Sequence, residues 1–226
     1  MPKAYITDID GTLTDNNRRL SLSAVAEIRR LIDCEIPVVL ASGNTVCFLD
    51  GLSHMIGTKG AIIAENGGVY RNGYLEEKYI VGNKNLCMEA YKKIIDELKP
   101  KGEELRLFSA EYRFSDIAFS RDISVETARD IIKNTGVEAV DTGFAIHLHT
   151  PNISKGAAFE KLARLMGLKT ADFLCTGDSV NDVEMLKLSG ISVTPANGST
   201  EAKSVACCIT EKPFGEGVAD ALKKYF

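Results

Sequence analysis

The chain has 226 residues, of which 45% are hydrophobic and 26% charged, and its formal net charge is −4. This balance is typical of a globular protein with one large or two small domains. The negative charge and the lack of a Lys and Arg cluster argue against nucleic acid as a partner, and no apolar run approaches the roughly 18 residues of a membrane span. Because Met1-Pro2-Lys3 leads directly into an apolar stretch, we expect no signal peptide. We expect a cytoplasmic protein that is a monomer or a small homo-oligomer. The six cysteines form no C-x-x-C pair, so we expect reduced thiols, most of them in core positions.

The first third of the chain alternates apolar strands with amphipathic helices. The predicted elements are a strand at 3–8, a helix that starts at Ser21 or Ser23, a strand at 36–41, a helix at 45–55 and a strand at 61–64. The run at 36–41 is almost continuously apolar, which is typical of a strand buried on both faces. This order predicts a parallel sheet with right-handed crossovers.

After Gly67-Gly68 the pattern changes to strand pairs joined by short turns. The expected elements are a hairpin of 69–70 and 74–81, a helix at 86–98 that stops before Pro100, strands at 105–109 and 113–119, a helix around 125–132, and strands at 137–140 and 144–149. Such pairs indicate a small antiparallel α+β module.

From Ser154 the α/β rhythm resumes. Helices are predicted at 155–166 and 183–188, strands at 172–176 and 191–194, and a last helix at the C-terminus. The predicted fold class is therefore α/β, with a Rossmann-like three-layer core of residues 1–81 and 154–226. An inserted α+β domain of residues 82–153 interrupts that core.

Two carboxylates follow the first strand, in the stretch Asp8-Ile9-Asp10-Gly11-Thr12. The chain turns at Gly11, so both carboxylates can point into one crevice. Two charges ~4 Å apart repel by about 4 kcal/mol at an effective dielectric constant of ~20. A shared proton or a bound cation must offset that repulsion, which predicts a reactive site. The alternative is an acidic turn at a sheet edge, since Asp, Gly and Thr are ordinary turn residues.

Three further motifs fall at strand ends or helix starts, where open parallel sheets bind their ligands. Ser42-Gly43-Asn44-Thr45 opens a helix, and its hydroxyls and free N–H groups suit either a phosphate or a plain helix cap. Lys155 lies in the first turn of a helix, where a cation is disfavoured unless an anion is near; a surface lysine is the alternative. Asp178 and Asp182 lie in Gly-Asp-Ser-Val-Asn-Asp. They either add two carboxylates to the site or are solvated acids at the start of a helix.

Together these residues indicate phosphate chemistry. Four carboxylates and a phosphate monoester carry more negative charge than Lys155 neutralises, which predicts a divalent cation, and all-oxygen ligands favour Mg²⁺. A carboxylate nucleophile, a second carboxyl group for proton transfer and a phosphate cradle fit phosphoryl transfer. Neither G-x-x-x-x-G-K-[ST] nor G-x-G-x-x-G occurs, so nucleotide cradles of those kinds are unsupported.

In this order, the four motifs resemble those of the haloacid-dehalogenase superfamily of phosphatases, and the insertion is similar to the type IIB cap of that superfamily. The resemblance covers the whole chain. It implies that Asp8 is the nucleophile that forms an aspartyl-phosphate. Asp10 would protonate the leaving oxygen and later activate water. Ser42 and the Gly43 backbone would hold phosphate, and Lys155 would bridge the phosphate and Asp8.

The resemblance also implies a metal site. Asp8, Asp178 and the region of Asp10 would bind Mg²⁺, while Asp182, with Asn181, would act through a ligated water or orient its neighbours. One departure concerns the phosphate-binding residue Asn44. Many relatives with this cap have Arg there, so the role of that Arg must be absent or replaced in this chain.

Within the superfamily, the short chain and compact cap are most similar to the archaeal-type phosphoglycolate phosphatases, which implies hydrolysis of 2-phosphoglycolate to glycolate and phosphate. A sucrose-phosphate-like sugar phosphatase, a mutase and a receiver module phosphorylated on Asp remain alternatives. A cap cation should meet the substrate carboxylate, and Arg113 is our candidate, with a solvated strand arginine as the alternative. His147 and His149 share one face of a strand, where a metal pair would need a third ligand, and His54 is expected at the surface.

Overall fold

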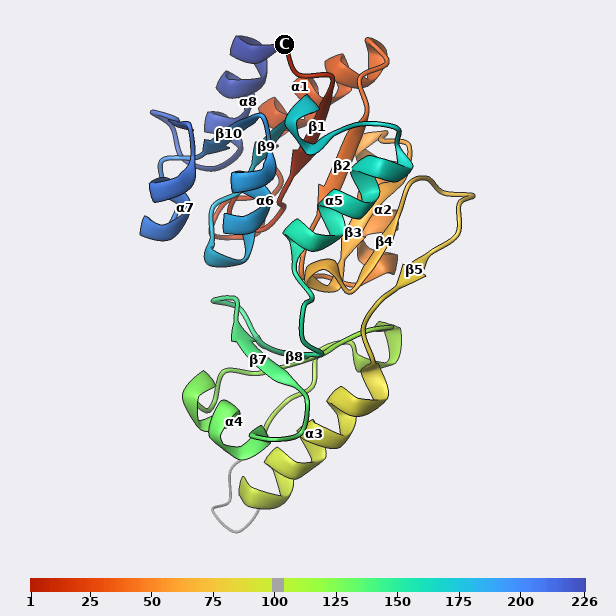
Figure 1. The fold of residues 1–226 in the computed structure, drawn as a ribbon. Helices are drawn as coiled ribbons and strands as arrows, with labels where there is room; N and C mark the ends of the chain where they lie inside the picture. The colour runs from red at the N-terminus through yellow and green to blue at the C-terminus, as the bar shows by residue number, and fades with distance from the viewer. Residues whose placement is uncertain (99–103) are drawn as a thin grey trace. The chain divides into compact units, whose positions relative to one another are not determined.

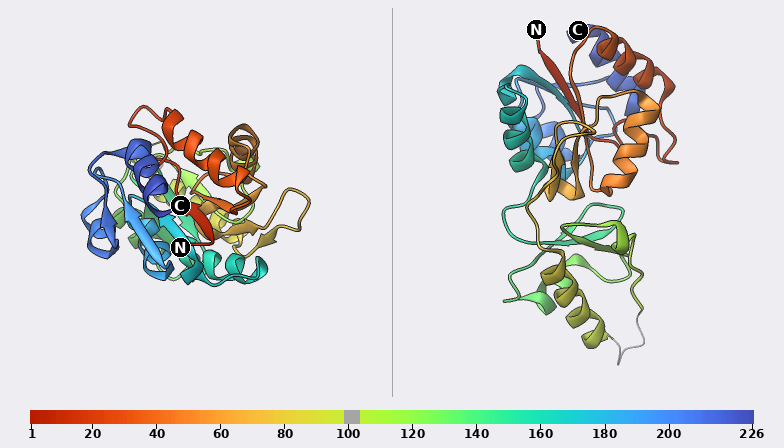
Figure 2. Two further views of the ribbon diagram at one scale, coloured as in Figure 1. Left: turned by 90° about the horizontal axis from the view of Figure 1, so that it is seen from above. Right: turned by 90° about the vertical axis from the view of Figure 1, so that its right-hand side faces the viewer.

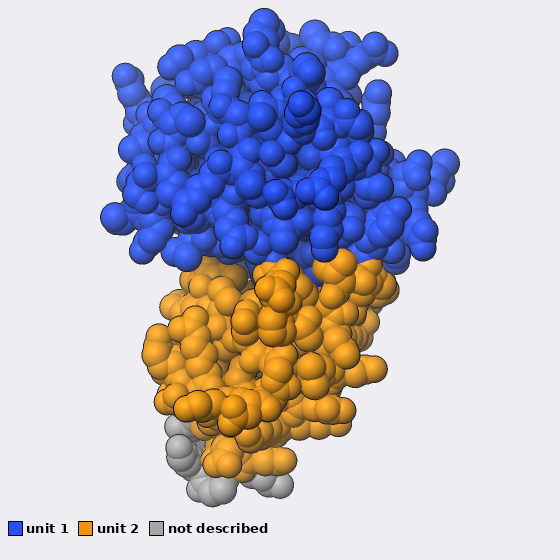
Figure 3. Space-filling view, in the orientation of Figure 1, with its two compact units in different colours: residues 1–79, 154–226 blue, residues 80–153 orange. Residues whose placement is uncertain are grey.

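The computed structural model describes residues 1–98 and 104–226 (Figure 1, with two further views in Figure 2). The chain divides into two compact units, which Figure 3 shows in different colours. The first consists of Met1–Tyr79 and Ser154–Phe226, and the second of Ile80–Ile153. The second unit therefore interrupts the first in sequence, and it begins two residues before the boundary expected at residue 82.

The first unit is built on one mainly parallel sheet. Its strands, in their order across the sheet, are β11 (Cys208–Ile209), β10 (Ile191–Thr194), β9 (Phe173–Thr176), β1 (Ala4–Thr7), β2 (Val38–Ala41), β3 (Ala61–Ala64), β4 (Val69–Arg71) and β5 (Tyr79–Ile80). Neighbours from β11 to β3 are parallel, and β4 is antiparallel to β3. The predicted parallel α/β core is confirmed.

Helices cover both faces of this sheet (Figure 2). One face carries α1 (Leu22–Asp33), α2 (Val46–Ile56) and α8 (Phe214–Tyr225), and the other carries α5 (Lys155–Leu165), α6 (Val183–Leu188) and α7 (Thr200–Val205). Successive residues of β1 alternate between the two cores, since Tyr5 packs with the first set and Ile6 with the second. The cap of α1 is Ser21 rather than Ser23, because the Ser21 hydroxyl accepts a hydrogen bond from the Ala24 N–H.

The second unit packs two helices on one face of a small sheet. The elements are α3 (Lys84–Leu98), α4 (Val125–Ile132) and the antiparallel strands β6 (Ile117–Phe119), β8 (Ile146–His149) and β7 (Glu138–Asp141), with β8 in the centre. Ile146 and Leu148 face the helices in a core of their own, so this unit has the predicted α+β composition. The predicted helix stop at Pro100 lies outside the described residues.

The strands predicted at 105–109 and 113–119 are wrong in extent. Only Leu107 forms a bridge, to Phe119. Ser109 has a φ of 53° and turns the chain into a 3₁₀ helix that ends at Tyr112, so the regular strand begins only at Ile117. The local turn overrides the strand propensity of these residues.

The predicted hairpin at 69–81 is also shorter than expected. Its second strand is limited to β5, because Tyr74 instead packs on α2. The Tyr74 hydroxyl donates to Ser53 over 2.8 Å, and its ring stacks on the exposed His54 at a centroid distance of 4.1 Å.

Short elements and cysteines complete the description. The 3₁₀ helices are η1 (Glu65–Gly67), η3 (Ala110–Tyr112), η4 (Thr170–Asp172) and η5 (Val180–Asp182). All six cysteines are free, but only Cys87 and Cys175 are buried, so the expectation that most lie in the core is wrong. Among the described residues, no helix has the length and apolar character to cross a bilayer.

Candidate active site

The predicted site residues gather at the carboxyl ends of three neighbouring parallel strands. Asp8 directly follows β1, Ser42 directly follows β2, and Asp178 lies two residues after the end of β9. Since β1 pairs with both β2 and β9, these motifs share one edge of the sheet. The Asp8 N–H is tied to the last residue of β9, donating to the Thr176 carbonyl oxygen over 2.9 Å.

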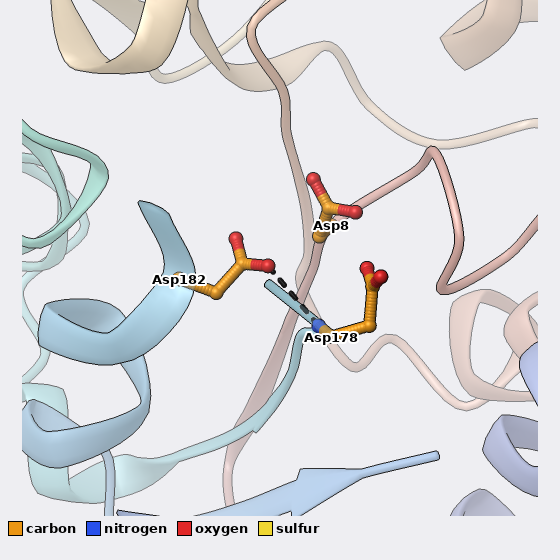
Figure 4. Close-up of side chains that lie close together, drawn as sticks. All are labelled: Asp8, Asp178 and Asp182. Carbon is orange, nitrogen blue, oxygen red and sulfur yellow. Dashed lines mark hydrogen bonds between the residues drawn. The ribbon is translucent and has the colours of Figure 1, made fainter. Parts of the chain in front are cut away.

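Three carboxylates form a close cluster there (Figure 4). Asp8, Asp178 and Asp182 each offer an oxygen, and these three atoms all lie within 4.8 Å of one another. Asp8 and Asp182 are buried, with 5% and 0% of their surface exposed. The carboxylate of Asp10 is not part of this cluster.

Lys155 joins two of these acids. Its Nζ donates to Asp8 Oδ1 over 2.5 Å and to Asp182 Oδ1 over 2.6 Å. The side chain is buried, so the alternative of a surface lysine is wrong. Burial alone would lower the pKa of Lys155, but the charges of Asp182 and Asp8 outweigh it and raise the pKa, so the ammonium stays charged. The Ser154 hydroxyl caps α5 and sets this side chain at the first turn of the helix.

The cluster carries more negative charge than Lys155 neutralises. Burial, followed by the charge of Asp182, raises the pKa of Asp8 well above its ordinary value despite the opposing charge of Lys155. The same two causes raise the pKa of Asp178 to about 6. A divalent cation would relieve this crowding, and a set of carboxylate oxygens without nitrogen or sulfur fits Mg²⁺.

Both carboxylate oxygens of Asp182 accept hydrogen bonds from the protein. One accepts from Lys155, and the other accepts from the backbone N–H groups of Asp178 and Ser179, each over 3.1 Å (Figure 4 shows the first of these two bonds). Asp182 therefore fixes both the Asp178 loop and Lys155. Thr12, from the first motif, donates to Asp178 Oδ1 over 2.8 Å and holds the same loop from the other side.

Asn44 links the first motif to the second. Its Nδ2 donates to Asp10 Oδ2 over 2.7 Å and to Ser42 Oγ over 3.1 Å, and its backbone N–H also donates to Ser42 Oγ. Thr45 is the first residue before α2, as the motif predicted. The Asn44 amide thus holds Asp10, and phosphate binding by Asn44 stays a prediction.

Sequence reasoning missed Asn66. Its Oδ1 accepts a hydrogen bond from Asn181 Nδ2 over 3.0 Å, which brings the end of β3 next to the fourth motif. Glu65-Asn66-Gly67-Gly68 lies at the carboxyl end of a predicted parallel strand. That position, at the end of a parallel strand, was the signal that could have identified Asn66.

In the second unit, Arg113 is buried rather than solvated. It donates to Asp116 Oδ1 over 2.7 Å and to the Phe108 carbonyl oxygen. Asp116 also contacts His147 Nδ1 at 2.9 Å, while His149 Nδ1 lies 2.9 Å from the Thr150 carbonyl oxygen. In the described part of the chain, the acid cluster alone brings three metal-ligating side chains within reach, so the two histidines lack a third ligand.

Comparisons with known proteins show the family of this chain. The model of a family described as haloacid dehalogenase-like hydrolase matches residues 5–138 and 137–222. A phosphoglycolate phosphatase of Methanoculleus marisnigri is 50% identical over 228 residues, covering 100% of this chain and 97% of its own. The crystal structure of Thermoplasma acidophilum 0175 has a TM-score of 0.88 at 25% identity, covering 99% of this chain and 98% of its own. The subclass IIB sugar phosphatase BT4131 shares the fold, with a TM-score of 0.74 at 16% identity, covering 99% of this chain and 98% of its own. With its four motifs at the strand ends and matches along its length, this chain belongs to the haloacid dehalogenase-like hydrolase family.

Proposed function

We propose that this protein is a Mg²⁺-dependent phosphatase that hydrolyses 2-phosphoglycolate to glycolate and phosphate. The observation that carries the proposal is the buried contact of Lys155 with Asp8 and Asp182, beside Asp178. The name of the relative from Methanoculleus marisnigri supports the choice of substrate. Residues 1–81 and 154–226 form the catalytic core in this proposal, and 82–153 form the cap.

In the first half-reaction, a carboxylate oxygen of Asp8 attacks phosphorus. The bond from phosphorus to the ester oxygen breaks and an aspartyl-phosphate forms, while Asp10 gives its proton to the leaving oxygen. Lys155 stays charged between Asp8 and the incoming phosphate oxygens. Ser42, the Gly43 backbone and Asn181 orient the phosphate.

In the second half-reaction, water attacks the same phosphorus from the side the ester left. Asp10, now ionised, takes a proton from that water, and the bond from phosphorus to Asp8 breaks to release inorganic phosphate. Asp8 and Asp178 would hold Mg²⁺, with Asp182 and the region of Asp10 completing its surroundings. When bound, Mg²⁺ supplies positive charge that neutralises the phosphate and the acid cluster.

The test is phosphate release from a panel of monoesters with and without Mg²⁺. We expect the highest kcat/KM for 2-phosphoglycolate, lower values for sugar phosphates, and loss of activity with EDTA. A higher kcat/KM for a sugar phosphate would show that 2-phosphoglycolate is not the preferred substrate, while the proposed phosphatase reaction would stand. A stable phosphorylated protein that releases no phosphate would indicate a receiver module instead.

A further inference from the structure

The turn between β3 and β4 contacts three of the four motifs, although it carries no residue used in the reaction above. The Glu65 N–H donates to the Asn44 carbonyl oxygen over 3.0 Å, and the Asn66 N–H donates to the Ser42 carbonyl oxygen over 3.2 Å. On the other side, a Cβ at Gly67 would lie 2.1 Å from the Ser154 carbonyl oxygen, so this glycine packs against the start of α5. The turn is therefore wedged between the Ser42 loop and the helix that carries Lys155.

The backbone of this turn is unusual. Glu65 and Asn66 are both left-handed, with φ angles of 52° and 54°, in a region that non-glycine residues rarely adopt. Asparagine tolerates it better than most side chains. The conformation directs the Asn66 side chain inward, where only 8% of the residue is exposed.

The two ends of the Asn66 amide have different surroundings. Its Oδ1 accepts from Asn181 Nδ2 over 3.0 Å, and Asn181 Oδ1 in turn accepts from the Ser179 hydroxyl. The Asn66 Nδ2 has no hydrogen-bond partner within residues 1–98 and 104–226. The amide lies directly on Gly43, where an added Cβ would come within 2.9 Å of Oδ1 and 3.1 Å of Nδ2.

We propose that Asn66 is a phosphate-binding residue: Nδ2 donates to a phosphate oxygen at the Ser42–Gly43 turn, while Oδ1 holds Asn181 in place. This inference rests on the proposed phosphatase function. The Nδ2 donor has no partner in the described part of the protein although only 8% of the residue is exposed, and an oxygen of the substrate phosphate would supply one. Because the amide is uncharged, Asn66 adds a donor to the site without adding to its charge.

Two substitutions separate phosphate binding from support of the turn. Asn66→Asp keeps the shape, the tolerance of a left-handed φ and an oxygen for Asn181, but it replaces the donor with a carboxylate oxygen that repels phosphate. Asn66→Gly keeps the backbone conformation and removes the whole amide. Asn134 provides matched controls, Asn134→Asp and Asn134→Gly, because it is an exposed asparagine with a φ of 68° in the turn between α4 and β7.

The assay is calorimetric binding of inorganic phosphate in the presence of Mg²⁺, with thermal melting to confirm folding. We expect Asn66→Asp to weaken binding by about 100-fold and Asn66→Gly by about tenfold, with both controls unchanged. Phosphate affinity within threefold of the wild type in Asn66→Asp overturns the inference, since Asn66 would then act only through Asn181 or the turn. If that variant does not fold, the same threefold limit applied to Asn66→Gly decides.

The two proposals fail differently. If the wild-type protein binds phosphate through Asn66 but hydrolyses no ester, the proposed function fails and the inference about Asn66 stands. If the protein is a phosphatase and the Asn66 variants bind phosphate as the wild type does, only the inference fails.

Discussion

The hydrogen bond from Asn44 to Asp10 leads to a quantitative prediction for Asn44→Ala. In the proposed mechanism Asp10 must present its proton to the leaving oxygen, and the 2.7 Å bond from Asn44 Nδ2 fixes where the carboxyl group points. A hydrogen bond to a charged group contributes about 1.5–3 kcal/mol. If all of it aligns Asp10 in the transition state, its loss lowers kcat by about 10- to 150-fold.

The effect should depend on the leaving group. 2-Phosphoglycolate has a poor leaving group that needs the proton from Asp10, whereas p-nitrophenolate needs little protonation. We therefore expect the rate of aspartyl-phosphate formation to fall steeply for phosphoglycolate and by less than about threefold for p-nitrophenyl phosphate. Rapid-quench measurement of phosphorylated protein and the burst of p-nitrophenol give these two rates.

The competing role for Asn44 is direct phosphate binding, as its place in the motif suggested. That role predicts equal losses for both esters, together with weaker binding of inorganic phosphate. Such a result would refute the assignment of Asn44 to Asp10. Asn44→Asp provides a second check: a carboxylate near Asp10 should cost more than the alanine, because it repels the negative charge that Asp10 gains as its proton leaves.

Three further predictions concern the acids. Asp8→Asn should be inactive on every ester, while Asp10→Asn should accept phosphate from acetyl phosphate and accumulate phospho-Asp8. Mass spectrometry of the quenched protein locates the phosphate, and a phosphate on any other residue would contradict these roles. Mg²⁺ should raise the melting temperature, because it binds the folded acid cluster and not the unfolded chain, and an unchanged melting temperature at millimolar Mg²⁺ would argue against the site. Burial raises the pKa of Asp116, but the hydrogen bond to His147 and the charge of Arg113 outweigh it and lower the pKa. The ionised carboxylate therefore stabilises the fold above its unfolded pKa of about 3.9. This stabilisation is lost as the pH falls below that value. Asp116→Asn should therefore cost about 3–5 kcal/mol near pH 7, and urea unfolding should show the difference shrinking below about pH 4.

The sequence was sufficient to predict residues whose position follows from strand order. Asp8, Ser42 and Asp178 each follow a strand whose apolar run is clear, and parallel strands end at one edge. Lys155 was a candidate from charge alone, because a cation at a helix N-terminus is disfavoured unless an anion is near, although a surface lysine was the alternative. The buried contacts of its Nζ with Asp8 and Asp182 agree with that reasoning.

Other features depended on contacts between distant segments or on local backbone geometry. Asn66 and Asn181 are 115 residues apart, and no periodicity links a turn to a residue at that distance. Arg113 lies in a stretch with strand propensity, but the left-handed Ser109 redirects the chain before it. Cys207 follows the apolar pair Val205-Ala206 yet is exposed. A strand as short as β11 has too few residues for its pattern to show which neighbours are buried.

Hydrogen bonds between the four motifs explain how side chains from separate strand ends are held firmly in one site. Thr12 joins the first motif to the fourth, Asn44 joins the first to the second, and Lys155 joins the third to both the first and the fourth. Asn66 closes the set by joining the second to the fourth, through its backbone on one side and its amide on the other. Donors held in place before substrate arrives need little reorganisation during the reaction. Each motif is held by another. The losses of activity from substitutions at two of these hydrogen bonds should therefore be strongly non-additive, as expected for residues that act as one unit.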